Sequence, residues 1–409
     1  MEKIEIEESK TTLWVGDSAE VLKQYPDNHF DSVVTDAPYG IEFLGKDWDN
    51  NTGAIEVWKE CLRVLKPGGY LLSFGAPRTY HRLATNLEDI GFEIKDSLMW
   101  LFGSGFPKAQ DVGKRLAKRD GTEASENKYD GWKTGLKPAH EPIVMCRKPT
   151  KLTATDNMVE WGVGALNIDA TRIPYEDEAD KNVGGRNKGT TYENNMFQGE
   201  AYKFDSKTKS VLSVANNQGR FPSNVIMSEE VGRDLDEKMG IKQYGNKKGG
   251  YKYDKTYNVE GFIKNNKPDS PSNYGDGGGV SKYFYCPKVN RKERHIGLDV
   301  NAIDKISQAT MSEHPLWDES MGTDINRLKN KIQQGVANAN THPTIKPIAL
   351  MLYLVKLITP PNGKVLDCFN GSGSTGMAVK EFGGEYVGID LDENYIEISR
   401  KRILAWDSK

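Results

Sequence analysis

The stretch KVLDCFNGSGSTG, residues 364–376, decides how this chain folds. It begins as the short apolar run of a buried strand and continues as a glycine loop that leads into a helix predicted to end at Phe382. A second strand, EYVGID at 385–390, ends in Asp390, 17 residues after Gly373. This order describes a unit that binds a nucleotide or nucleoside, because glycines let the backbone approach the ligand and the acid holds ribose hydroxyls. A tight turn with a purely structural role is the alternative. The loop lacks a Walker lysine, which argues against a triphosphate.

The N-terminal part of the chain repeats this alternation. Strands are predicted at 13–17, 30–35, 70–75, 92–102 and 142–146, and helices at 18–25, 55–65 and 79–90, with a turn at 66–69. Such alternation is typical of a doubly wound α/β sheet. Because this kind of sheet binds ligands beyond the carboxyl ends of its strands, the sequence DAPY at 36–39 is a candidate site. An ordinary turn is the alternative interpretation, since Asp, Pro and Gly all form turns.

A nucleotide-binding unit normally begins a fold, whereas here it ends the chain. If the last helix is joined to the first residues, four strands end in turn at Asp367, Asp390, Asp17 and Asp36, which is a regular progression. The chain is therefore predicted to be circularly permuted. In such a sheet the ligand crevice opens between the first and fourth of these strands, which would bring DAPY beside the glycine loop.

Composition limits the class of protein. A chain of 409 residues is long for one core, and 37% hydrophobic with 28% charged residues suits a soluble protein. No membrane span is apparent, and the charged start lacks the apolar core of a secretory signal, so a cytoplasmic location is expected. The four cysteines form no CxxC pair, which argues against a zinc ribbon and a disulfide framework.

The middle of the chain differs from its two ends. From about residue 151 to 338 the alternating pattern gives way to Gly, Asn, Lys and Tyr. Residues 181–295 hold 21 Lys and Arg against 13 Asp and Glu, although the whole chain has a net charge of -3. This composition suits a nucleic-acid surface or a solvated insertion. Three parts are therefore expected: 1–150, an inserted irregular domain at 151–337, and 338–409.

These motifs resemble the permuted, or beta, class of amino-methylating DNA methyltransferases, which modify adenine N6 or cytosine N4. THPTIKP at 341–347 resembles the segment that closes over the methionine part of the cofactor, and KPAHEP at 137–142 resembles the stretch before the seventh strand. GRFPSN at 219–224 and KYFYC at 282–286 resemble phage and restriction-type members. The resemblance to the class as a whole covers both α/β parts of the chain.

The resemblance implies a Rossmann-like methyltransferase that uses S-adenosyl-L-methionine to methylate the exocyclic amine of a base flipped out of double-stranded DNA. The Asp36 carboxylate and the Ala37 main-chain oxygen would each accept one amino hydrogen and align the nitrogen for attack, while Tyr39 stacks on the base. Ala37 stands where the family commonly has a first proline, which leaves the loop less rigid. The Asp at the first position favours adenine N6, with cytosine N4 as the alternative.

The matched motifs imply the site residues. The catalytic tetrapeptide is Asp36, Ala37, Pro38 and Tyr39. Cofactor contacts are expected from Asp17, Thr344, Lys346, Asp367, Phe369, Gly371, Gly373, Ser374 and Asp390. Phosphate contacts are expected from Arg220, Lys247, Lys248, Lys252, Arg291, Lys292 and Arg294, unless these are merely solvated. Asp17 has helix capping as its alternative, Trp58 is expected in the core, and no metal site is expected. Phe43 and Trp48 are expected to form a mobile lid.

Other functions match part of the pattern. A nicotinamide oxidoreductase would share the glycine loop and the acid but has no use for DAPY. A methyltransferase of RNA or of protein glutamine could use a similar tetrapeptide but does not usually carry so large a basic insertion. An inactive DNA-binding relative is supported only by Ala37. Cytosine C5 methylation is disfavoured because neither Cys61 nor Cys146 follows a proline. The oligomeric state stays open, although the permuted class is often dimeric.

Overall fold

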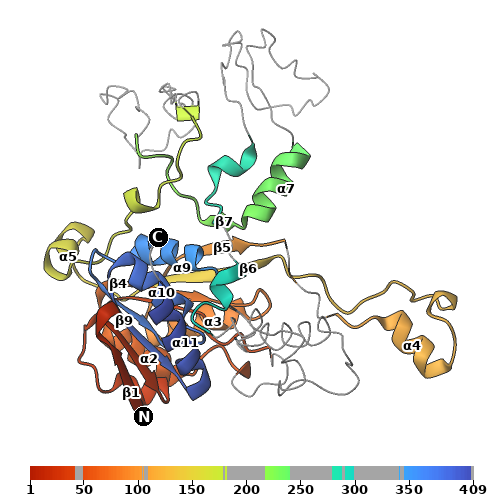
Figure 1. Ribbon diagram of the computed structural model, residues 1–409, viewed down its shortest axis with the longest axis horizontal. Coiled ribbons are helices and arrows are strands. Elements are labelled where there is room, and N and C mark those ends of the chain that lie inside the picture. Colours follow the sequence, from red (N-terminus) through yellow and green to blue (C-terminus); the bar gives the residue numbers. More distant parts are fainter. Residues whose placement is uncertain are drawn as a thin grey trace, which may run out of the picture. The chain divides into compact units, whose positions relative to one another are not determined.

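The protein is described by a computed structural model, in which the chain forms two compact units (Figure 1). The described residues are 1–41, 49–103, 105, 109–177, 180–181, 217–239, 279–287, 291–298, 340 and 345–406. The first unit comprises Met1–Thr171, Asn224–Val231 and Cys286–Lys409, and the second comprises Arg172–Ser223 and Gly232–Tyr285. The division at residues 150 and 337 stays a prediction. No helix within the described ranges is long and apolar enough to cross a membrane.

The described part of the first unit is built on a nine-stranded sheet with the order β1-β2-β9-β8-β3-β4-β6-β5-β7. The strands are β1 (Glu2–Ile6), β2 (Thr11–Val15), β3 (Phe30–Thr35), β4 (Leu65–Phe74), β5 (Glu93–Leu101), β6 (His140–Arg147), β7 (Val225–Met227), β8 (Lys364–Asp367) and β9 (Glu385–Asp390). The five strands from β2 to β4 in this order are parallel, whereas β1 and β6 run antiparallel to their neighbours.

The two C-terminal strands lie in the middle of this sheet. β9 pairs with β2, and β8 pairs with β3. Counted from β8, the four central strands stand in the order 3-2-1-4, which is the doubly wound order with its ligand crevice between strands 1 and 4. The predicted doubly wound α/β fold is therefore confirmed, and the strands that flank the crevice are β8 and β3.

Two groups of helices accompany the sheet. α1 (Ser18–Leu22), α2 (Ile55–Val64) and α3 (Tyr80–Ile90) form one group, and α9 (Ile348–Ile358), α10 (Ser374–Phe382) and α11 (Glu393–Ala405) form the other. Successive strand side chains point to opposite faces. Val33 joins the core cluster with α1–α3, whereas Ser32 bonds Thr359 after α9 with 2.8 Å between their hydroxyl oxygens. The two groups thus cover opposite faces.

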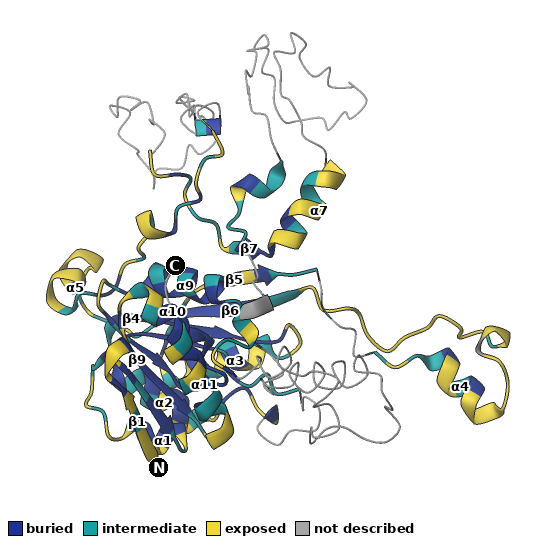
Figure 2. Ribbon diagram, viewed as in Figure 1, coloured by how far each residue is buried: buried dark blue, intermediate teal, exposed yellow. Residues whose placement is uncertain are grey.

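Among the described residues, three further α-helices lie outside these groups: α4 (Val112–Asp120), α5 (Ala154–Trp161) and α7 (Glu229–Met239). Short 3-10 helices span Glu7–Ser9, Ala124–Glu126, Asp169–Thr171, Val280–Tyr283 and Arg291–Arg294. Figure 2 shows the contrast in burial between the central strands, which are buried along most of their length, and α4, which is mostly exposed.

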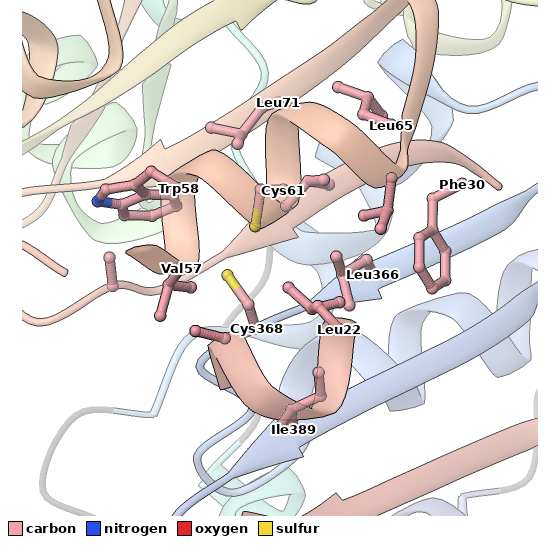
Figure 3. Packing of buried hydrophobic residues seen from close by; sticks show 14 of the residues in the cluster. Leu22, Phe30, Val57, Trp58, Cys61, Leu65, Leu71, Leu366, Cys368 and Ile389 are labelled. Atoms are coloured by element: carbon pink, nitrogen blue, oxygen red, sulfur yellow. The ribbon is translucent and has the colours of Figure 1, made fainter. Parts of the chain in front are cut away.

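Trp58 stands in the core between the sheet and α1–α3 (Figure 3). Its side chain is fully buried, and its Nε1 donates to the Thr52 main-chain oxygen at 3.1 Å. The Trp58 ring meets the Phe369 ring edge-on, with 5.5 Å between centroids. The prediction that Trp58 belongs to the core is confirmed. Cys368 follows β8 and belongs to this core, and Phe369 packs against it, so the core also supports the start of the glycine loop.

Three local predictions are wrong. The predicted turn at 66–69 belongs to β4, because the Lys148 backbone N–H donates to the Gly69 oxygen and the Gly68 N–H donates to the Lys148 oxygen. The helix predicted to reach Tyr25 ends at Leu22. In the described part of the middle of the chain, α5, β7 and α7 are regular elements where the sequence predicted irregular structure.

The packing of Trp58 predicts a large effect of its removal. Trp58→Ala should lower the free energy of unfolding by about 3 to 5 kcal/mol, because it leaves a cavity in the core. Trp132, which is 63% exposed, offers a matched control. Trp132→Ala should change the free energy of unfolding by about 0.5 kcal/mol or less. Urea unfolding followed by circular dichroism measures both. Equal losses in the two variants would contradict this assignment of the core.

Candidate active site

The tetrapeptide begins directly after β3, whose six residues are all buried. Ala37 is 2% exposed, whereas Asp36 and Tyr39 are half-buried. The Thr35 hydroxyl donates to Asp367 Oδ1 at 2.6 Å, across 332 positions of sequence. The structure thus brings the end of β3 and the end of β8 together, and with them DAPY and the glycine loop.

A buried carboxylate holds the loop that follows the tetrapeptide. Asp49 Oδ1 accepts the backbone N–H groups of Tyr39 at 2.5 Å and Gly40 at 3.0 Å, and Asp49 Oδ2 accepts that of Ile41 at 3.3 Å. Gly40 has a φ of +64°, which favours glycine. From the other side, the Thr79 hydroxyl donates to the Tyr39 main-chain oxygen at 2.5 Å. The tetrapeptide is therefore fixed without a first proline.

Lys346 joins the catalytic tetrapeptide. Its Nζ donates to Asp36 Oδ2 at 2.6 Å and to the Tyr39 hydroxyl at 3.1 Å, and it lies 3.4 Å from Glu141 Oε2. The Tyr39 hydroxyl donates to Asp36 Oδ1 at 3.0 Å. The ammonium also lies 4.9 Å from the centre of the Phe74 ring. We predicted Lys346 as a cofactor contact, but in this structure its partners are the tetrapeptide and Glu141.

Charge and burial shift the pKa values in this group, which we call the Lys346 cluster (Asp36, Tyr39, Glu141 and Lys346). Burial raises the pKa of Tyr39 well above its ordinary value, and Asp36 adds to this effect. Burial also raises the pKa of Glu141, although Lys346 opposes it. Burial lowers the pKa of Lys346, but Asp36 and Glu141 outweigh it and the net pKa is raised. The lysine is therefore a buried cation held by two carboxylates.

The glycine loop between β8 and α10 requires its glycines. Gly371 and Gly373 have φ values of +50° and +78°, and a Cβ at Gly373 would lie 2.2 Å from the Ser399 hydroxyl. Asn370 Oδ1 accepts the hydroxyls of Tyr386 at 2.8 Å and Ser399 at 3.2 Å. Side chains from β9 and α11 thus fix the loop in an open turn that no other residue type would adopt without strain.

Two acids end β8 and β9. Asp367 is 2% exposed, and its two oxygens accept the hydroxyls of Thr35 and Thr375, the latter at 2.5 Å. Asp390 accepts the backbone N–H groups of Gly371 at 2.8 Å and Asp392 at 3.0 Å. Burial raises the pKa of both acids to about 6. Asp367 therefore links β3, β8 and α10, while Asp390 links β9 to the glycine loop.

Arg402 was missed by the sequence analysis. This fully buried side chain of α11 donates to the main-chain oxygen of Ser372, to the Ser372 hydroxyl at 3.0 Å and to the Glu293 main-chain oxygen at 3.0 Å. Burial lowers the pKa of the guanidinium to about 10. The sequence did hold a signal for this burial. Arg402 stands next to Ile403 and three residues after Ser399, so helical spacing puts it on the buried face of α11. Arg402 holds the glycine loop from the helix side.

Other predicted cofactor residues lie around this loop. Phe369 follows β8 and is half-buried, and Ser374 is the buried first residue of α10. Asp17 is exposed and caps α1 by accepting the Glu20 N–H at 3.1 Å, which is the alternative we considered for it. Their cofactor contacts stay predictions. Thr344 and the expected lid residues Phe43 and Trp48 lie outside the described residues.

The predicted DNA contacts are distributed differently. In the second unit, the Arg220 guanidinium pairs with the buried Asp180 and lies between the rings of Tyr175 and Tyr283, 4.8 and 5.0 Å from their centres. Arg294 is exposed. Lys247, Lys248, Lys252 and the side chains of Arg291 and Lys292 lie outside the described part of the chain. All seven phosphate contacts stay predictions, and Arg220 already has a protein partner.

No group of three or more His, Cys, Asp or Glu side chains that could hold a metal ion occurs among the described residues. At the end of β3 the site presents the Asp36 carboxylate and the Ala37 backbone carbonyl, and the glycine loop begins at the end of the neighbouring strand β8. Carboxylate and carbonyl oxygens at such a strand end can accept hydrogen bonds from an amine and orient it.

Comparisons with known proteins agree with this geometry. A model of the N6/N4 methyltransferase family, described as DNA methylase, matches residues 30–401. The type II methyltransferase M.HindIII of Haemophilus influenzae is 28% identical in an alignment of 201 residues, and the match covers 38% of this chain and 64% of the relative. M.HinfI of Haemophilus influenzae is 33% identical over 120 residues, which are 29% of this chain and 31% of the relative. The matched parts thus span less than two thirds of either relative.

Solved structures are similar at low identity. The PvuII DNA methyltransferase, described as cytosine-N4-specific, is 13% identical with a TM-score of 0.43, over 96% of this chain and 86% of that chain. Because the family model covers most of the sequence, including both strand ends of the site, the chain belongs to the N6/N4 DNA methylase family.

Proposed function

We propose that this protein methylates the exocyclic amine of a base in double-stranded DNA, using S-adenosyl-L-methionine, with adenine N6 as the favoured acceptor. One observation carries the proposal: Asp36 and the Ala37 carbonyl stand at the end of β3, directly beside the end of β8 that opens into the glycine loop. Family membership supports the reaction class. The names of the relatives, type II methyltransferases, support DNA as the substrate.

The chemistry explains why this site needs two acceptors. The lone pair of an exocyclic amine is delocalised into the ring, so the nitrogen is a poor nucleophile. Hydrogen bonds from its two N–H groups to Asp36 and to the Ala37 oxygen favour a pyramidal nitrogen with an aligned lone pair. When bound, S-adenosylmethionine supplies a methyl group on a cationic sulfur, which keeps the electron pair of the broken C–S bond. The nitrogen forms the new N–C bond and gives one proton to Asp36, which passes it to solvent.

The local structure fits these roles. Asp36 already accepts two hydrogen bonds, but a carboxylate offers about four lone-pair positions, so it retains capacity for an amine. Ala37 contributes only its backbone oxygen. Asp49 and Thr79 hold Tyr39 and Asp49 also holds Gly40, which compensates for the missing proline. Tyr39 is proposed to stack on a base that has left the duplex, since the amine is otherwise paired inside it.

The glycine loop fits the nucleoside and amino-acid parts of the cofactor. Gly371 and Gly373 adopt positive φ values and carry no side chain, so the backbone of the loop stays accessible to a ligand. Hydrogen bonds of Arg402 and Asn370 hold the loop to other parts of the protein. Asp390 lies at the end of β9, where an acid can bind ribose hydroxyls. These residues would bind and orient the cofactor, while the tetrapeptide would orient the amine.

Cytosine N4 is the alternative acceptor, because the same two hydrogen bonds suit its amine. The first-position Asp favours adenine. Double-stranded DNA as partner is supported by the excess of Lys and Arg in residues 181–295. A cytoplasmic location and a homodimer accord with the proposal as further expectations.

The role of Asp36 predicts a specific loss of activity. Asp36→Asn should lower the rate of transfer of labelled methyl groups from S-adenosylmethionine to DNA by roughly 100- to 1,000-fold, because a strong acceptor for the developing positive charge is lost. The affinity for S-adenosylhomocysteine should change less than about threefold. Asp89→Asn on the exposed side of α3 is the matched control and should be as active as the unaltered protein. An active Asp36→Asn variant would refute the proposed mechanism.

The raised pKa of Asp390 predicts a pH-dependent cofactor affinity. Only the ionised acid can accept from ribose hydroxyls at both oxygens, and its pKa in the folded protein is about 6. The affinity for S-adenosylhomocysteine should therefore be full above pH 7 and fall as the pH is lowered through about 6. Calorimetric titration between pH 5 and 8 measures this fall. Asp390→Asn should bind weakly, and its affinity should fall less with pH, because of the two acids only Asp367 then titrates in this range. An unchanged fall in that variant would show that Asp390 does not cause it.

The basic segment predicts a salt-dependent contribution to DNA binding. Replacing Lys247, Lys248 and Lys252 together by Gln should reduce the slope of log affinity against log salt by about 3, if each lysine contacts one phosphate. Replacing Lys3, Lys10 and Lys23 in the N-terminal part serves as the control and should leave the slope unchanged. Fluorescence anisotropy with labelled duplex at several salt concentrations gives both slopes. Equal slopes in the two triple variants would remove this segment from the DNA interface.

A further inference from the structure

Glu141 brings a second carboxylate to the Lys346 cluster. It lies near the start of β6, next to β4, which carries the Phe74 ring against which Lys346 lies. Glu141 Oε2 is 3.4 Å from Lys346 Nζ, and Asp36 Oδ2 is 2.6 Å from the same atom. The side chains of Lys346, Asp36 and Glu141 are 6%, 18% and 21% exposed. Three charged groups therefore share a site from which most water is excluded.

Their charges do not cancel. One ammonium stands between two carboxylates, which leaves a net charge of about −1 when all three are ionised. Charges at such distances interact strongly where water is scarce. The surplus negative charge therefore has a larger effect on neighbouring groups here than it would have at the surface. Without Glu141, Lys346 would neutralise Asp36 directly. With Glu141, the ammonium is shared, and Asp36 remains a negatively charged acceptor.

The proposed reaction needs this surplus negative charge beside the amine. As the amine nitrogen forms its bond to the methyl group, it passes from neutral towards positive, before the proton leaves. Preorganised negative charge beside that nitrogen lowers the barrier, whereas an uncompensated ammonium 2.6 Å from the Asp36 carboxylate raises it. Lys346 remains useful as a rigid hydrogen-bond donor that orients the Asp36 carboxylate and the Tyr39 hydroxyl.

We propose that Glu141 is a positioning residue of the methyl-transfer site, which holds Lys346 and offsets its charge so that Asp36 keeps its strength as an acceptor for the amine. This inference rests on the proposed function. Glu141 acts through Lys346 and is not expected to touch the base. A purely structural ion pair is the competing explanation, and the two differ in what happens when both partners of the pair are removed.

The test compares single and double variants of Glu141 and Lys346. Glu141→Gln keeps the shape but makes the cluster neutral, so kcat for DNA methylation should fall about 10- to 100-fold while KM for DNA stays within about threefold. In the double variant Glu141→Gln with Lys346→Met, Asp36 alone restores the net charge of about −1. Its kcat should therefore exceed that of Glu141→Gln by at least fivefold, despite the additional substitution.

Controls separate this inference from folding and from the proposed function. Glu93 of β5 pairs with Arg147 at the end of β6 that is far from Glu141. Glu93→Gln removes this carboxylate and should leave kcat unchanged. Thermal unfolding of each variant, and its affinity for S-adenosylhomocysteine, report an intact fold and cofactor site. If the unaltered protein methylates DNA but the double variant is as slow as Glu141→Gln or slower, the charge role of Glu141 is refuted. A lack of methylation by the unaltered protein would instead refute the proposed function.

Discussion

The parallel pairing of β3 with β8 is the contact on which the site depends. It places Ser32 opposite Val365 and Val33 opposite Leu366, and the Thr35 hydroxyl bonds Asp367 where the two strands end. Because the carboxyl ends of parallel strands meet at one edge of the sheet, residues from the two ends of the chain emerge side by side. Every other feature of the site either holds one of these strand ends or supplies a group to the crevice between them.

The charged side chains of the site have partners that the fold positions, although the charges of the Lys346 cluster do not cancel. Asp49 fixes the loop after the tetrapeptide, Arg402 fixes the glycine loop, and Lys346 with Glu141 sets the environment of Asp36. All five side chains belong to polar groups whose burial is costly unless they are paired. Asp49 and Arg402 are paired mainly with backbone groups. Asp36, Lys346 and Glu141 are paired with one another. These pairings explain how the charged side chains are buried without destabilising the fold.

Much of the fold could be predicted from the sequence, because local patterns determine it. The βαβ unit with its glycine loop and the strand before Asp36 were predicted within a residue or two, and helix spacing placed Trp58 in the core. The predicted turn at 66–69 was wrong because backbone hydrogen bonds between Gly68, Gly69 and the distant Lys148 override turn propensity. Glu141, Asp49 and Arg402 were not predicted as parts of the site, since their roles arise only when segments far apart in sequence meet.

The central claim is that this crevice methylates an exocyclic amine. Its most direct test is to incubate the purified protein with mixed-sequence DNA and S-adenosylmethionine, digest the DNA to nucleosides, and identify the methylated nucleoside by mass spectrometry. We expect N6-methyladenine. N4-methylcytosine would still show methylation of an exocyclic amine, but with cytosine as the acceptor base. The appearance of 5-methylcytosine instead, or of no methylated nucleoside on any of several DNAs, would contradict the account.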